Sequence, residues 1–311
     1  MAKSLEIFNP TPVFIGGTGR SGTTIVGDLL NEHPQIRTSL PTEIKFLANS
    51  GGLLDLTFGR GVSEKRVFIF NYRTYKKRKK RDKERFDEFF DLIWDKWWQI
   101  DAPPPHGRGL ASGISKVKLE TILARFKKSY KRNRINAASQ FLSSLIKDQD
   151  LSGNEMYWIE TTPLNIANAP RILKIAPNAK FINMMRDPRD VISSLLTKNW
   201  GPNSPLEGIE WIEKRITQGH LALQAIPLDQ QITIKLENLV IHNRVKTYQR
   251  LLEFLGLKDS IEMQQFFDSK ITLDAASAGR WKNEISDPIF DKKYKEMLDR
   301  LKNIGVSSYQ D

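Results

Sequence analysis

The stretch FIGGTGRSGTTIVGDLL, residues 14–30, decides the fold that the sequence predicts. A short buried strand enters a turn with four glycines, and an amphipathic helix leaves the turn. Glycine allows the backbone to approach an anion closely, and the free N–H groups at a helix start favour negative charge. We therefore predict a loop that binds a phosphate or a sulfate. Its glycines are Gly16, Gly17, Gly19 and Gly22, and its candidate ligand side chains are Arg20, Ser21, Thr23 and Thr24.

The position of the positive charge in this loop differs from that in the common nucleotide hydrolases. Residues 17–24 have the Walker spacing, but Thr23 stands where those enzymes carry a lysine. That lysine binds the terminal phosphates of the nucleotide, whereas the cation of this loop is Arg20. The loop is thus typical of anion binding and a poor match to an ATP hydrolase. A glycine-rich turn without a ligand is the structural alternative.

A second candidate site follows the strand in KFINMMRDPRDVISSLL, residues 180–196. Asp187 fits the N-cap of the next helix, before a proline in its first position, and Asp190 fits the capping-box partner. Ligands of parallel sheets bind beyond the carboxyl ends of the strands. Arg186 stands at that end and Ser194 lies two turns along the helix, so both are candidates for binding a second phosphate. In the alternative interpretation, Arg186 bridges Asp190 in a well-capped helix.

Strands alternate with helical patterns along most of the chain. The alternation predicts an α/β fold, a P-loop-type parallel sheet flanked by helices. Residues 50–150 interrupt the alternation, and we predict a mainly helical, acceptor-facing insertion there within one domain spanning residues 1–311. The other expected strands are 36–40, 156–160, 180–185 and 232–236, and the other expected helices are 84–100, 114–147 and 244–255.

Composition narrows the class of protein. The chain has 311 residues and no cysteine, which excludes a disulfide scaffold, thiolate metal sites and a cysteine nucleophile. Its four histidines are scattered, which argues against an all-histidine metal site. Residues 1–12 lack the apolar core of a secretory signal, and no stretch approaches the roughly 18 apolar residues of a membrane span. We expect a cytoplasmic protein without a membrane span.

Basic charge is concentrated in one segment. The net charge is +12, and residues 73–85 hold nine basic and two acidic side chains, a local charge of +7. A solvated helix face is the favoured interpretation, and a docking surface for a polyanion or an acidic substrate is the alternative. No nucleic-acid-binding module surrounds the segment, so nucleic acid is not an expected partner.

The two motifs resemble those of the sulfotransferases that use 3′-phosphoadenosine 5′-phosphosulfate (PAPS). The loop at residues 16–24 is similar to their 5′-phosphosulfate motif, and Arg186 with Ser194 is similar to their 3′-phosphate motif. Tyrosylprotein-type and bacterial branches are the most similar, on FIGG…RSGTT and the HP at residues 33–34. The resemblance implies that the protein transfers a sulfuryl group from PAPS without a metal. The acceptor would be a small molecule, a glycan or a peptide, and acidic acceptors are included. In the family, the residue at Arg20 neutralises charge on the leaving phosphate and on the sulfuryl group.

The segment SAGRWK, residues 277–282, resembles the basic loop that folds over the nucleotide in this family. The resemblance implies that Gly279 belongs to this loop, that Arg280 and Lys282 meet the 3′-phosphate, and that Trp281 packs near the adenine. An exposed loop with one buried tryptophan is the alternative.

An acceptor hydroxyl or amine must lose a proton as it attacks sulfur. Glu43, after the second expected strand, resembles the base of the tyrosylprotein-type branch and is our candidate base. A carboxylate that stabilises a helix N-terminus is the alternative. His106 is the second candidate base. The chain departs from that branch at its acid-Lys-Thr-Pro segment, where Thr161 replaces the lysine.

Two other functions share parts of this pattern. A P-loop kinase or NTPase would use the same loop, but it would need a lysine at Thr23 and Mg²⁺. A non-catalytic nucleotide- or polyanion-binding protein would bind the same ligand without transferring sulfate.

Overall fold

The computed structural model describes residues 5, 7–59, 72–99, 109–149, 151–306 and 309, with the helix backbone alone at 72–79, 81 and 82. Its centre is a sheet of five parallel strands in the order β2-β3-β1-β4-β5. This arrangement confirms the predicted parallel α/β fold. The strands are β1 (Thr11–Gly17), β2 (Ile36–Thr38), β3 (Tyr157–Glu160), β4 (Lys180–Met185) and β5 (Gln231–Lys235).

The central strand β1 brings distant parts of the sequence together. Phe14 of β1 pairs with Glu160 of β3, and Gly17 pairs with Met184 of β4. Because all five strands are parallel, their carboxyl ends and the loops that follow them lie along one edge of the sheet. The glycine loop after β1 and the segment of Arg186 after β4 therefore start side by side.

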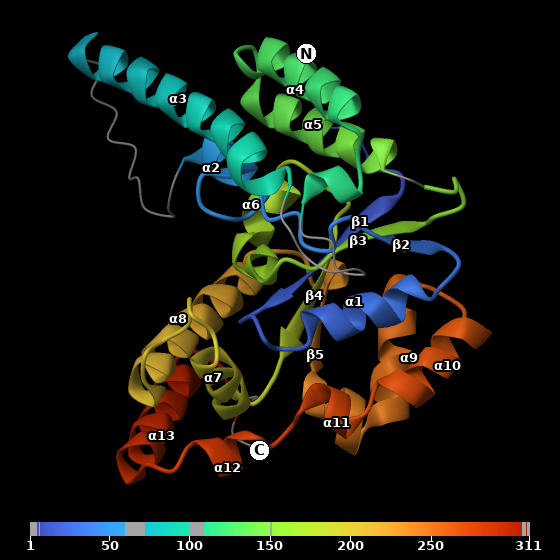
Figure 1. Cartoon of the computed structure of the whole chain (residues 1–311), viewed down its shortest axis with the longest axis vertical. Helices are drawn as coiled ribbons and strands as arrows, with labels where there is room; N and C mark the ends of the chain where they lie inside the picture. The colour runs from blue at the N-terminus through green and yellow to red at the C-terminus, as the bar shows by residue number, and fades with distance from the viewer. Residues whose placement is uncertain are drawn as a thin grey trace.

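Helices cover both faces of the sheet (Figure 1). Val13 and Ile15 of β1 pack in a core with α1, α9 and α10, whereas the intervening Phe14 points to the opposite face. A third core joins α7, α8 and α13. These helices are α1 (Thr23–Asn31), α7 (Pro188–Leu196), α8 (Pro205–Gln224), α9 (Arg244–Leu255), α10 (Ile261–Lys270) and α13 (Pro288–Asn303).

The insertion between β2 and β3 forms a helical lobe at the top of Figure 1. Phe46, Phe89 and Phe141 make edge-to-face contacts in its core, and Phe14 of β1 belongs to the same core. The predicted helical insertion is therefore confirmed in the described residues, and it packs directly on the sheet. Its helices are α2 (Leu53–Phe58), α3 (Tyr72–Leu92), the π-helix η1 (Ile93–Trp97), the short η2 (Leu110–Ser112), α4 (Lys116–Tyr130) and α5 (Arg134–Asp148).

The segment 114–147 is mostly helical, as predicted, and it forms two helices, α4 and α5. The chain turns between them, and Asn133 caps α5 by accepting a hydrogen bond from Asn136 N at 3.0 Å. Both helices bury a face in the same core, so the helical spacing of apolar residues continues across the turn and hides it. A polar residue with N-capping ability was the sequence signal that marked the break.

Most other boundaries agree with expectation. β4 and α9 begin and end where predicted, whereas β2 ends early, at Thr38. Pro188 opens α7, as predicted, and Pro163 opens the short helix η3 (Pro163–Asn168). Among the helices in the described part of the chain, none combines the length and the apolar character needed to cross a bilayer.

Candidate functional site

The glycine loop, residues 17–22, has the backbone shape that its glycines allow. Gly19 and Gly22 have φ angles of 81° and 93°. A Cβ at Gly17 would lie 2.3 Å from a carbonyl oxygen of β4, so a larger residue does not fit there. Arg20 has a φ of 56°, a left-handed conformation that costs free energy for a residue with a side chain. The fold therefore holds Arg20 in a strained position at the edge of the sheet.

The start of α1 is open to a ligand. Gly22 is the N-cap residue and no side chain caps the helix, so the first N–H groups are available to another partner. Ser21 Oγ is buried and has no hydrogen-bond partner in the described part of the chain. Thr23 is buried beside it and Thr24 is exposed. An anion at this point would satisfy both the N–H groups and the Ser21 hydroxyl.

Arg20, Arg186 and Ser194 lie in direct contact. Arg20 Nε donates a hydrogen bond to Ser194 Oγ at 2.9 Å, and Arg186 Nη1 donates to Arg20 O at 3.1 Å. Arg186 Nη2 donates to Ser277 O at 2.7 Å. The two predicted anion sites are thus adjacent, and the predicted basic loop reaches the second of them.

Asp190 connects the second site to the basic loop. Its buried carboxylate accepts hydrogen bonds from Gly279 N at 2.7 Å and from Trp281 N at 3.1 Å. It also lies 3.9 Å from the guanidinium of Arg186. The bridge between Arg186 and Asp190 is therefore present, and the same carboxylate holds the basic loop in place.

The predicted capping box in α7 is wrong. Asp187 caps the helix as expected, by accepting from Arg189 N at 2.9 Å, but its own N–H donates to Glu237 Oε1 at 2.8 Å. The Asp187 side chain thus bonds Arg189 N instead of Asp190 N, and tertiary partners take the Asp187 N–H and the Asp190 carboxylate. Burial lowers the pKa of the Arg186 guanidinium, and the carboxylates of Asp190 and Glu237 oppose this effect.

Two side chains of the basic loop, those of Arg280 and Trp281, contact other residues of the protein. Arg280 forms an ion pair with Glu284 at 2.9 Å, and the Trp281 ring lies 3.9 Å from the guanidinium of Arg189. Lys282 is exposed. The loop, between α11 (Leu273–Ala276) and α12 (Trp281–Glu284), therefore meets Arg186 through its backbone.

Glu43 lies in an irregular segment between β2 and α2, so the alternative of a helix N-terminus is wrong. Its carboxylate is 3.7 Å from Lys45 Nζ. The next residue, Ile44, donates its N–H to Glu160 Oε1 at 2.9 Å. A backbone carbonyl of the same segment accepts two hydrogen bonds from Thr161, both at 2.9 Å. These bonds attach the segment of Glu43 to the carboxyl end of β3, beside β1.

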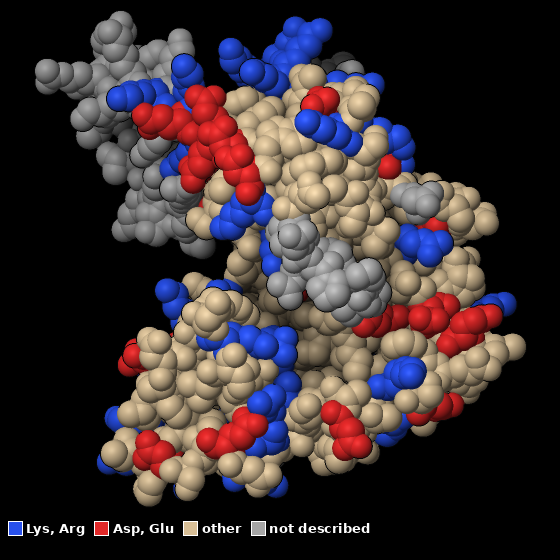
Figure 2. Space-filling view, viewed as in Figure 1, with Lys and Arg blue, Asp and Glu red and all other residues tan. Residues whose placement is uncertain are grey.

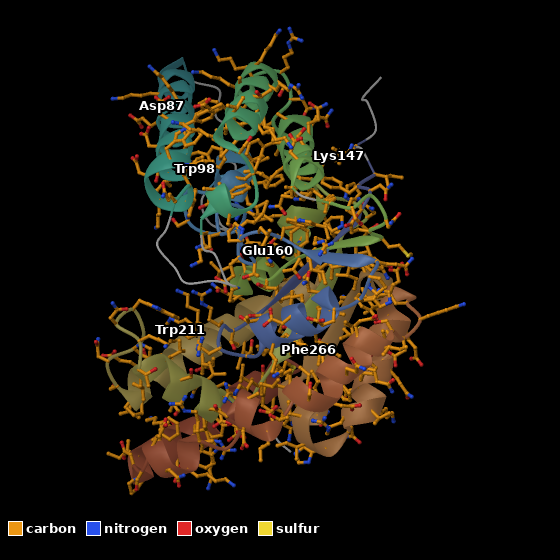
Figure 3. The ribbon with its side chains drawn as sticks, turned by 45° about the vertical axis from the view of Figure 1, so that its right-hand side comes forward. Asp87, Trp98, Lys147, Glu160, Trp211 and Phe266 are labelled. Atoms are coloured by element: carbon orange, nitrogen blue, oxygen red, sulfur yellow. The ribbon has the colours of Figure 1, made fainter. Side chains whose placement is uncertain are left out.

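Glu160 is a buried carboxylate to which the sequence analysis assigned no role. It accepts hydrogen bonds from Ile44 N, from Thr162 N at 3.1 Å, and from the side chains of Thr162 and Asn165. Desolvation raises the pKa of Glu160 to about 7, although these hydrogen bonds lower it. Figure 3 shows Glu160 at the junction of the helical lobe and the rest of the molecule. An acidic residue at the end of an apolar strand, YWIE, was the signal that pointed to it.

Thr161 occupies the place of the missing lysine and is buried in a hydrogen-bonded position. Its side chain therefore supplies no charge to the sheet edge. Lys45, which pairs with Glu43, is a cation that the spacing of the motifs did not reveal. Its φ of 34° shows that the backbone is distorted at this point.

Two expectations concern the insertion at residues 50–150. His106 lies outside the described residues. The basic segment 73–85 lies in α3, and its described pair, Lys80 with Glu84 at 3.9 Å, is highly exposed, as on a solvated helix face. Figure 2 shows a hollow between the helical lobe and the rest of the molecule, with Lys and Arg side chains gathered along its lower rim.

Comparisons with known proteins agree with this fold. The sulfotransferase domain from the curacin biosynthetic pathway superposes with a TM-score of 0.53 at 14% identity, covering 96% of this chain and 99% of that one. The sulfotransferase domain of the Synechococcus PCC 7002 olefin synthase gives 0.50 at 15% identity, with 97% and 98% covered. A search of curated proteins found no sequence match. The model of the sulfotransferase family matches residues 12–260 and includes both anion motifs, so this chain belongs to the sulfotransferase family.

Proposed function

We propose that this protein transfers a sulfuryl group from PAPS to a hydroxyl or an amine of an acceptor. The observation that carries the proposal is the contact between the two anion sites, in which Arg20 binds Ser194 and Arg186 binds the backbone of Arg20. PAPS carries a phosphosulfate and a second phosphate on one ribose. A donor of this kind needs two anion sites side by side, whereas a nucleoside triphosphate needs one continuous site.

The residues at the sheet edge fit such a donor. The uncapped start of α1 and the Ser21 hydroxyl would hold the 5′-phosphosulfate. Arg186 and Ser194 would hold the 3′-phosphate, with the basic loop beside them. Arg186 Nε is buried without a hydrogen-bond partner in the described residues, so it retains a donor for that phosphate.

Arg20 would stabilise the charge that develops during transfer. In the reaction, the acceptor atom forms a bond to sulfur while the bond between sulfur and the 5′-phosphate oxygen breaks, and the phosphate leaves with that electron pair. Fixed donors aimed at the leaving oxygen lower the barrier because they need no reorganisation. Ser194 Oγ holds Arg20 through Nε, which leaves the Nη donors of the guanidinium for the phosphate.

Glu43 would accept the proton that the acceptor loses. Its side chain is about one third exposed, so an acceptor can reach it. Its hydrogen-bonded segment lies at the edge that also carries the glycine loop. Lys45, 3.7 Å away, would supply positive charge that Thr161 cannot.

Thermal unfolding with nucleotides tests the proposal. We expect 3′-phosphoadenosine 5′-phosphate (PAP) without Mg²⁺ to raise the Tm, because a ligand at 100 times its Kd stabilises the fold by about 2.7 kcal/mol. ATP with Mg²⁺ should have little effect. An equal response to ATP with Mg²⁺ would indicate a kinase or NTPase instead. Binding of PAP without transfer of labelled sulfate to any hydroxyl or amine in an acceptor panel would indicate a non-catalytic protein.

A further inference from the structure

A cavity of 320 Å³ lies behind the glycine loop. Gly17 and Thr18 form one wall, and η3 and β4 form the next. The rest is closed by α8 together with Gly305, Val306 and Tyr309. Ile166, in the η3 wall, belongs to the core that contains Phe14. The cavity thus borders the first residues of the glycine loop, and Arg20, Ser21, Arg186 and Ser194 do not line it.

Arg215 of α8 lines this cavity and has no counter-charge. Its guanidinium lies 4.9 Å from the ring of Trp211, which Figure 3 labels on α8. Among the residues that the structure describes, no carboxylate or other acceptor pairs with it. Burial lowers the pKa of Arg215. A partly desolvated charge without a partner destabilises a fold, so its place beside a cavity points to a ligand.

Two other arginines, Arg300 and Arg171, have the counter-charge that Arg215 lacks. Arg300, which packs against the same helix, pairs with Glu213 at 2.7 Å. Arg171 lies 3.1 Å from an Asp55 oxygen and also donates to two backbone carbonyls. Arg300 and Arg171 thus have partners within the described chain, whereas the partner of Arg215 would come from outside it.

The other walls define the class of ligand. Most are apolar, and His220 Nε2 is already engaged with Ile304 O at 2.9 Å. The volume is at the lower end of the range for small-molecule sites. A guanidinium binds a carboxylate through two parallel hydrogen bonds. The cavity therefore suits a compact apolar molecule with a single carboxylate. Its apolar lining includes Leu164, Ile166, Met184, Leu223 and Val306.

The cavity begins at the donor loop. Thr18 lines it, and Thr18 stands two positions before Arg20. We propose that the cavity is the acceptor site and that Arg215 binds the carboxylate of an acidic acceptor. This inference rests on the proposed function. The carboxylate stays unchanged in the reaction. The hydroxyl at the other end of the molecule forms a bond to sulfur, the bond between sulfur and the 5′-phosphate oxygen breaks with its electron pair going to the phosphate, and the hydroxyl proton passes to Glu43.

Calorimetric titration of the PAP-saturated protein tests the inference. The probes are 4-hydroxyphenylacetate and 10-hydroxydecanoate, each compared with its neutral amide. In the wild type, we expect at least one carboxylate to bind more than tenfold more tightly than its amide. In Arg215→Gln, the two should bind within about twofold of each other, and PAP affinity should not change. Arg300→Gln, which removes a paired arginine nearby, should keep the wild-type preference.

Two further measurements keep the test independent of one variant. Arg215→Gln should raise the Tm of the ligand-free protein, since it removes an uncompensated charge. Gly219→Leu, in the α8 wall, should fill the cavity and weaken both carboxylates without weakening PAP.

The failures are distinguishable. If PAP binds the wild type and neither carboxylate binds better than its amide, the inference is overturned and the proposed function stands. If PAP does not bind the wild type, the proposed function fails and the acceptor role of the cavity fails with it.

Discussion

The proposed donor site at the sheet edge, here called the donor edge (Arg20, Arg186 and Ser194), differs from the cavity beside it in how its arginines are held. At the donor edge, Arg20 is bonded to Ser194, and Arg186 is bonded to two backbone carbonyls. In the cavity, Arg215 has a ring beside it and no counter-charge in the described chain. The arginines of the proposed donor site are thus held by partners within the protein, whereas Arg215 has no counter-charge within the described chain.

This difference indicates a division of roles. A site that is organised in advance loses little free energy in ordering its side chains, which favours catalysis on one fixed donor. A cavity with one uncompensated charge instead selects among acceptors, because a neutral molecule leaves that charge unpaired. Substitutions at the donor edge should therefore act on kcat and donor binding, and substitutions in the cavity on acceptor binding.

The largest effect is expected at Glu43. Glu43→Gln keeps the shape of the side chain and removes its capacity to accept a proton, so kcat should fall by roughly 10²- to 10⁴-fold, as for other general bases. PAP affinity should stay within about twofold. Glu262→Gln, an exposed glutamate of α10, serves as the matched control. Wild-type turnover of the Glu43 variant would direct attention to His106 as the base.

A somewhat smaller loss is expected at Arg20. Arg20→Ala should lower kcat by about 10²- to 10³-fold, the usual effect of removing one donor that stabilises transition-state charge. The Tm should change little, because the Arg20 side chain has a single hydrogen bond to Ser194. Steady-state kinetics and a thermal melt measure the two effects. Unchanged turnover would remove the chemical distinction between the donor edge and the cavity.

Glu160 gives a prediction about stability and pH. Its pKa in the fold is about 7, against a usual 4.5. Below pH 4.5 the carboxyl is protonated in both states. Between pH 4.5 and pH 7, Glu160 ionises in the unfolded chain but keeps its proton in the folded chain. The free energy of unfolding therefore falls as the pH rises, by about 3 kcal/mol in total, and it stays lower above pH 7.

Urea unfolding at pH 5 and pH 8 measures this effect. The wild type should lose stability over this interval relative to Glu160→Gln, which cannot ionise at this position. The comparison between the two proteins cancels the contribution of all other groups. Parallel pH profiles for the two would show that Glu160 is ionised throughout, held by its four donors.

The sequence predicted the parts of the molecule that depend on local order. Strand and helix spacing located the sheet, and the glycines and Arg20 located the loop, because these signals lie within a few neighbouring residues. It did not predict that Asp190 turns away from its own helix, since its partners Gly279 and Trp281 lie about ninety positions along the chain. The isolation of Arg215 was equally hidden, because the absence of a partner is a property of the packed structure.

Asp190 offers the finest test of the organised donor edge. Its carboxylate accepts two backbone N–H groups and so fixes the loop that meets Arg186. In Asp190→Asn, one of the two acceptor oxygens becomes an NH₂ group, which faces an N–H and cannot bond to it. A lost hydrogen bond to a charged group costs about 1.5–3 kcal/mol, so the KM for PAPS should rise about tenfold or more.

Asp190 acts through the loop and does not touch the transferred group, so kcat should change by less than about threefold. Hydrogen exchange at residues 277–281 should speed up in the same variant. Glu284→Gln is the matched control, because Glu284 holds the same loop from the exposed side, through Arg280. If kcat falls while the KM for PAPS and the exchange rates remain those of the wild type, Asp190 does not position the loop, and the donor edge is organised by Arg186 alone.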